Sequence, residues 1–81
     1  MAEIKMYTTE WCGDCRRAKK FLGERGIAYE EINIEEREGA AEHVMSLNGG
    51  KRKVPTFEVA GRAFSLSPFD ERRLREELGL D

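Results

Sequence analysis

The sequence predicts an α/β fold in which a four-stranded mixed sheet is flanked by three helices, in the order βαβαββα. Four short segments carry alternating or clustered apolar residues of the β-branched and aromatic kinds, as strands do. Three other segments repeat apolar residues every three or four positions, as helices do. Because a strand–helix–strand unit crosses over in the right-handed sense, the first two strands are expected to lie parallel in one sheet.

The first half of the chain predicts a strand, a helix and a second strand. Residues 2–7 alternate between apolar and polar and predict the first strand. The helical pattern over residues 13–25 stops at Gly26, a residue that suits the left-handed position after a helix. Residues 28–34 are rich in β-branched and aromatic residues but are charged along one side. This composition is typical of a strand at the edge of a sheet.

The second half begins with a helix and continues into a hairpin. The acidic pair at residues 35–36 suits the start of the second helix, and Asn48-Gly49-Gly50 supplies its termination. Residues 54–59 and 62–65 are two short apolar runs. Only Ala60-Gly61 separates them, which predicts a tight turn between two antiparallel strands.

The last helix has its own start and stop residues. Ser67 offers a capping hydroxyl, Pro68 suits the first helical position, and Gly79 closes the helix. The sequence shows no repeat, linker or low-complexity segment. We therefore expect residues 1–81 to form a single domain.

Charge and hydropathy limit the partners that the chain is expected to have. The 14 Lys and Arg residues against 16 Asp and Glu residues give a formal net charge of -2, which argues against nucleic acid or an anionic membrane as the main partner. No apolar run approaches the roughly 18 residues of a membrane span, and the N-terminus lacks the pattern of a secretion signal. The sequence therefore predicts a cytoplasmic protein, which we expect to be a monomer.

Two cysteines, three positions apart, are the strongest candidates for chemistry. Cys12 lies where the first helix begins, and the unpaired N–H groups and helix dipole there favour a thiolate. Asp14 opposes this effect, but an exposed charge is worth about 0–1 kcal/mol against up to about 2 kcal/mol for a helix terminus. We predict that the Cys12 sulfur attacks a disulfide and that Cys15 resolves the mixed intermediate.

The same cysteine pair also looks like half of a zinc site. A structural zinc ion needs four ligands, and the rest of the chain offers only His43 as a further cysteine or histidine ligand. We therefore favour redox chemistry over metal binding. His43 could be imagined as a general base for Cys12, but its place on the second helix favours a partly exposed helix residue.

Residues near the cysteines predict where a substrate lies. Trp11 could pack in the core or offer a flat surface to a substrate beside the sulfur, and the sequence favours neither. The Val54-Pro55 pair starts a strand after a loop, where a cis peptide bond is expected although that form is a minority overall. A backbone exposed in this way could pair with an extended peptide-like thiol. The basic residues 51–53 could attract its carboxylates, although such runs are usually solvated loops.

Four stretches of the sequence, in the order in which they follow one another along the chain, are specific for one family when they occur together. They are Tyr7-Thr8-Thr9-Glu10-Trp11-Cys12-Gly13-Asp14-Cys15, Asn48-Gly49-Gly50, Val54-Pro55-Thr56 and Ser65-Leu66-Ser67. With them the chain resembles the glutaredoxins over essentially its whole length, and most of all the mycoredoxins and related actinobacterial-type glutaredoxins. The resemblance implies a thioredoxin-like fold, Pro55 in cis and Cys12 as the attacking thiol.

The resemblance also implies a substrate and its contacts. The expected reaction is the reduction of mixed disulfides between proteins and a low-molecular-weight thiol, with no bound cofactor. Oxidised or S-thiolated proteins are then the partners, and the thiol or a flavoprotein reductase recharges the protein. Together with the residues discussed above, this gives a predicted substrate site: Trp11, Lys53, Val54, Pro55 and Ser67.

Two departures from the family pattern leave the small thiol open. Many glutaredoxins have a lysine where this chain has Thr9, and two glycines followed by an acid where it has Ser65-Leu66-Ser67; both positions help to hold glutathione in that family. Glutathione, mycothiol, bacillithiol or a protein disulfide are therefore all candidates. The alternative functions are an electron donor to a reductase such as ribonucleotide reductase, an iron–sulfur cluster carrier, and a redox-inactive interaction module.

Overall fold

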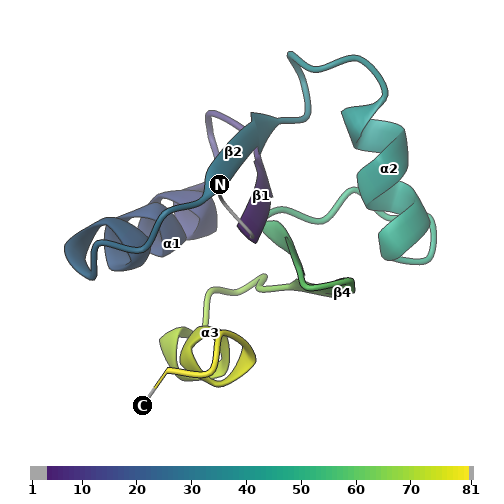
Figure 1. Cartoon of the computed structure of the whole chain (residues 1–81). Coiled ribbons are helices and arrows are strands. Elements are labelled where there is room, and N and C mark those ends of the chain that lie inside the picture. Colours follow the sequence, from purple (N-terminus) through teal and green to yellow (C-terminus); the bar gives the residue numbers. More distant parts are fainter. Residues whose placement is uncertain (1–3, 81) are drawn as a thin grey trace.

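The computed structural model describes residues 4–80, and within that range the elements follow the predicted order (Figure 1). Their bounds are β1 (Ile4–Thr8), α1 (Gly13–Glu24), β2 (Glu30–Asn33), α2 (Ala40–Leu47), β3 (Thr56–Val59), β4 (Arg62–Ser65) and α3 (Glu71–Glu77). The part of the first predicted strand at residues 2–3 lies outside the described residues. None of the helices in residues 4–80 is long and apolar enough to cross a bilayer.

The four strands form one mixed sheet in the order β2-β1-β3-β4. β1 pairs with β2 in the parallel sense and with β3 in the antiparallel sense, so the predicted parallel pair is confirmed. β3 and β4 form the predicted hairpin. Its two turn residues, Ala60 and Gly61, both have left-handed φ angles of 52° and 80°, the geometry that matches the twist of a two-residue hairpin.

The sheet separates two apolar clusters because successive residues of β1 point to opposite faces. Met6 points toward α1 and α3, and Tyr7 points toward α2, which lies on the other side of the sheet in Figure 1. The buried residues of the larger cluster are Met6, Ala18, Phe21, Leu22, Phe57, Phe64, Leu66 and Leu74. Those of the smaller cluster are Tyr7, Ile32, Ile34, Ala40 and Val44.

The start of the second helix differs from the prediction. We expected the helix to begin at Glu35 or Glu36, but α2 begins at Ala40. The Asn33 side-chain oxygen accepts the N–H of Glu35 at 2.8 Å, and the Asn33 carbonyl accepts that of Glu36 at 3.1 Å, so a turn forms where the helix was expected. Gly39 then takes a left-handed φ of 83°, which a continuous helix does not allow.

The start of the third helix also differs from the prediction, which placed the cap at Ser67. The cap is Asp70, whose Oδ1 accepts the N–H of Arg73 at 3.2 Å. The Ser67-Pro68 peptide bond is cis, and the N–H of Phe69 is bonded to a side chain of α1 rather than within a helical turn. A tertiary contact therefore holds these residues outside the helix, and a second capping residue three positions later starts it.

Candidate active site

Cys12 lies at the start of α1 and acts as its N-cap. Its backbone is extended, with φ -90° and ψ 112°, and its Sγ accepts the N–H of Cys15 at 3.1 Å. The carbonyl of Cys12 accepts the N–H of Arg16 at 3.2 Å. The sulfur therefore takes the place that a Ser or Asp oxygen usually has at a helix start, where a donated N–H stabilises negative charge.

Cys15 lies one turn further along α1 and is fully buried, whereas 8% of Cys12 is exposed. Burial, followed by a hydrogen bond with Cys12, raises the pKa of the Cys15 thiol to about 12. Cys15 therefore remains protonated at neutral pH. The Cys12 sulfur is thus bonded to the backbone of Cys15, and the two residues differ in exposure.

The Val54-Pro55 segment lies beside the Cys12 sulfur. Its peptide bond is cis, as predicted. The Cys12 thiol donates to the carbonyl of Val54 over 3.6 Å, and the carbonyl of Pro55 accepts the N–H of Leu66 at 3.0 Å. The structure thus brings together residues from α1, the chain before β3 and the chain after β4.

Trp11 lies on the surface, with 70% of the residue exposed, so it does not pack in the core. It borders a small, mostly apolar cavity of about 100 Å³ next to the cysteine motif. The lining residues are Thr9, Trp11, Ile34, Arg52 and Val54. The Thr9 Oγ1 atom is buried and has no hydrogen-bond partner within residues 4–80.

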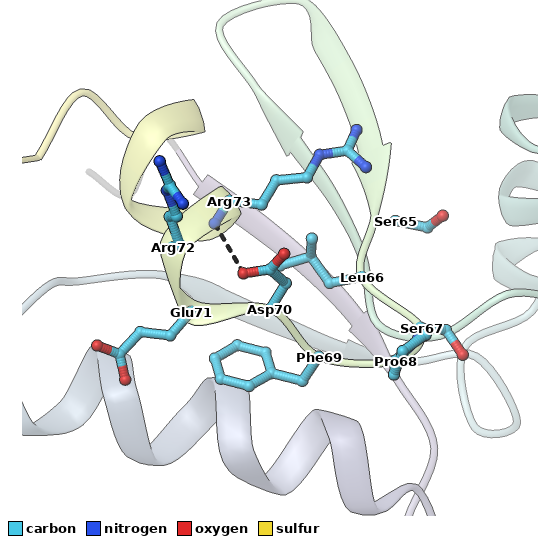
Figure 2. A pocket seen from close by; sticks show the side chains of 9 residues that line it. All are labelled: Ser65, Leu66, Ser67, Pro68, Phe69, Asp70, Glu71, Arg72 and Arg73. Carbon is cyan, nitrogen blue, oxygen red and sulfur yellow. Dashed lines mark hydrogen bonds between the residues drawn. The ribbon is translucent and has the colours of Figure 1, made fainter.

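Lys53 and Ser67 are the two remaining residues of the predicted substrate site, and they lie in separate places. Lys53 is exposed and its carbonyl accepts the hydroxyl of Thr56 at 2.6 Å, while the neighbouring Arg52 borders the small cavity. Ser67 is exposed and lines a separate hollow of about 540 Å³ at the start of α3, as Figure 2 shows. Leu66, which also lines this hollow, donates its N–H to the carbonyl of Pro55.

Asp14 makes a contact that the sequence analysis missed. Its Oδ1 accepts the backbone N–H of Phe69 at 3.0 Å and the Nη1 of Arg17 at 3.1 Å. The sequence showed Asp14 only as a charge between the cysteines. A partner 55 residues away leaves no local pattern by which it could have been found.

The His43 side chain contacts residues of the sheet directly. Its Nε2 lies 2.9 Å from Oε1 of Glu58, which also accepts the Tyr7 hydroxyl at 2.6 Å. Burial alone would raise the pKa of Glu58, but the hydrogen bonds from Tyr7 and His43 outweigh it and lower this pKa. His43 is a partly exposed helix residue, as predicted. Within residues 4–80, no three His, Cys, Asp or Glu side chains are grouped to hold a metal ion.

A slightly exposed cysteine at a helix start, a fully buried cysteine one turn behind it and a cis-proline segment bonded to the first define a thioredoxin-like thiol–disulfide oxidoreductase. The chain belongs to the glutaredoxin family, whose model matches residues 4–64. A Mycobacterium tuberculosis protein provisionally named a glutaredoxin is 46% identical over 67 residues, which are 83% of this chain and 80% of the relative. Mycoredoxin 1 of Corynebacterium glutamicum is 35% identical over 84% of both chains.

A solved structure shows the same fold. The glutaredoxin-like protein NrdH-redoxin of Escherichia coli superposes with a TM-score of 0.75 and 26% identity, over 90% of this chain and 91% of that one. The predicted fold and the resemblance to actinobacterial-type glutaredoxins are therefore confirmed.

Proposed function

We propose that the protein reduces mixed disulfides between proteins and a low-molecular-weight thiol, with Cys12 as nucleophile and Cys15 as resolving thiol. One observation carries this proposal. The Cys12 sulfur accepts an N–H group at the start of α1, whereas Cys15 is fully buried and has a pKa of about 12. Only one of the two sulfurs is suited to attack a disulfide from solvent at neutral pH.

The reaction consists of two exchanges. The Cys12 thiolate attacks the small-thiol sulfur of the mixed disulfide, the protein thiolate leaves and takes up a proton, and Cys12 is now bonded to the small thiol. A second small thiolate then attacks that sulfur, which yields the oxidised small disulfide and restores the Cys12 thiolate. In the alternative second step, Cys15 loses its proton and displaces the small thiol, and the resulting Cys12–Cys15 bond needs two electrons from a reductase.

The surroundings of Cys12 support a small polar thiol as co-substrate. The cavity beside Trp11 is mostly apolar, and Thr9 and Arg52 are the polar residues that line it. We propose that the thiol lies along Val54-Pro55, with Lys53 and Ser67 at either end of the site. Because mycoredoxin 1 is among the relatives, mycothiol is the first thiol to test, followed by glutathione and bacillithiol.

The similarity to NrdH-redoxin favours a second candidate, an electron donor to a reductase such as ribonucleotide reductase. In this case a flavoprotein reductase, and not a small thiol, restores the Cys12 and Cys15 thiols. Parallel assays with each electron donor separate the two functions. Visible absorbance of the freshly purified protein would instead indicate an iron–sulfur carrier.

Trapping with Cys15→Ser tests the first proposal. In this variant the mixed disulfide on Cys12 cannot be resolved internally. Mass spectrometry of the variant after incubation in a cell extract is expected to show one small thiol on Cys12, whose mass identifies it. The variant Cys12→Ser is the matched control and is expected to carry no adduct. An adduct on Cys15 in this control, with none on Cys12 in the first variant, would reverse the proposed roles.

A further inference from the structure

A long-range hydrogen bond connects the cysteine motif to the chain that leads into α3. Asp14 lies in the first turn of α1, and its Oδ1 accepts the backbone N–H of Phe69 at 3.0 Å. The Asp14 side chain is 25% exposed, so water competes only partly for this bond. Bonds with an ionised acceptor are stronger than bonds between neutral groups.

This bond satisfies a group that would otherwise lack a partner. Phe69 precedes Asp70, the cap of α3, so its N–H lies outside the helix. Its ring packs against the larger apolar cluster and lies beside α1 in Figure 2. Phe69 and Phe21 also border a second hollow together. Both the backbone and the side chain of Phe69 are therefore held against the helix that begins at Cys12.

The two residues before Phe69 are held from both sides. On one side, Leu66 donates its N–H to the carbonyl of Pro55 at 3.0 Å, and on the other Phe69 donates to Asp14. Residues 67–68 thus span from the cis-proline segment to the active-site helix. Both are exposed, and they line the hollow of about 540 Å³ shown in Figure 2.

We propose that Asp14 is a positioning residue, whose carboxylate fixes residues 67–68 beside the Cys12 sulfur as one wall of the substrate site. This inference rests on the proposed function, in which Ser67 contacts the substrate. The Asp14 charge has a separate effect, because a negative group in the first turn of α1 opposes a second negative charge on Cys12. Asparagine keeps the acceptor oxygen and removes the charge, so the two effects can be measured separately.

The test compares Asp14→Asn with Asp14→Ala in the full chain. The readouts are kcat and KM with a peptide–glutathione mixed disulfide and the hydrogen exchange of the Phe69 amide. With alanine, we expect the Phe69 amide to exchange about five- to tenfold faster and KM to rise by a similar factor, with kcat within about twofold. With asparagine, we expect KM and the exchange rate to stay near the wild-type values.

The variant Arg17→Met is the matched control. It removes the other partner of the Asp14 carboxylate and leaves the bond to Phe69, so Phe69 exchange and KM should not change. Equal KM values for the asparagine and alanine variants, or unchanged Phe69 exchange in the alanine variant, would overturn the proposal. If the wild-type protein reduces neither this probe nor the corresponding peptide–mycothiol and peptide–bacillithiol disulfides, the proposed function fails, and the exchange comparison still shows whether Asp14 holds Phe69.

Discussion

The two cysteine side chains lie one helical turn apart and yet have different surroundings. Cys12 is the cap of α1 and retains some exposure, whereas Cys15 belongs to the buried face of the same helix. The carbonyl of Val54 accepts the Cys12 thiol proton, while the N–H of Cys15 favours the ionised sulfur. The Cys12 sulfur thus serves as a donor to one backbone group and as an acceptor from another.

Selective alkylation follows from this difference. At about pH 8, one equivalent of iodoacetamide is expected to modify Cys12 and leave Cys15 untouched, because Cys15 is fully buried and its pKa is about 12. Peptide mapping by mass spectrometry locates the added mass. In about 6 M guanidinium chloride, a concentration at which such domains are unfolded, both cysteines should react. Modification of Cys15 in the native protein would contradict the burial described above.

At the scale of elements, the third helix shows how a tertiary contact overrides a local one. Both Ser67 and Asp70 are suitable capping residues, and the proline that follows Ser67 favours Ser67 as the cap. Because the N–H of Phe69 is bonded to Asp14, the helix begins after the second candidate, and Asp70 is the cap. In α2 the cause is local instead, because the turn at Asn33 delays the start of the helix until Ala40.

The capping assignment can be tested by two matched substitutions. Asp70→Ala is expected to lower the free energy of unfolding by about 1 kcal/mol, because the N–H of Arg73 loses its acceptor. Ser67→Ala is expected to change it by less than about 0.5 kcal/mol, because Ser67 is exposed and caps no helix. Urea unfolding followed by circular dichroism measures both values. A larger effect at Ser67 than at Asp70 would restore the original prediction.

At the scale of the whole molecule, the order and pairing of the elements were predictable from local patterns. Alternation defined the strands, helical spacing defined the helices, and the handedness rule placed β1 beside β2. The cysteine pair and the cis Val54-Pro55 bond were also predictable, because each is encoded by neighbouring residues. The contact of Asp14 with Phe69 and the cavity formed by Thr9, Ile34 and Arg52 were not, because they depend on how distant segments pack.

The Tyr7, Glu58 and His43 contacts connect α2 to two strands, and their contribution to stability should depend on pH. The folded pKa of Glu58 is lowered, so its stabilisation is present above the unfolded value near 4.5 and is lost as the pH falls through the folded pKa. Glu58→Gln is expected to lower the free energy of unfolding by about 1 kcal/mol at neutral pH. The difference from wild type should shrink below about pH 4.

Urea unfolding at the two pH values measures this dependence. Glu42→Gln is the control, because Glu42 is an exposed residue of α2, and its effect should stay within about 0.5 kcal/mol at both pH values. A Glu58→Gln effect of the same size at both pH values would show that the charge of Glu58 does not contribute.

The two apolar clusters differ in size, and this difference has a consequence for substrate selection. Val54 packs against the smaller cluster under α2, whereas α1 belongs to the larger one. Regions with fewer buried contacts open locally at a lower free energy. We therefore expect the Val54 backbone, along which we propose that the substrate lies, to adapt to substrates of different shape more readily than α1 does.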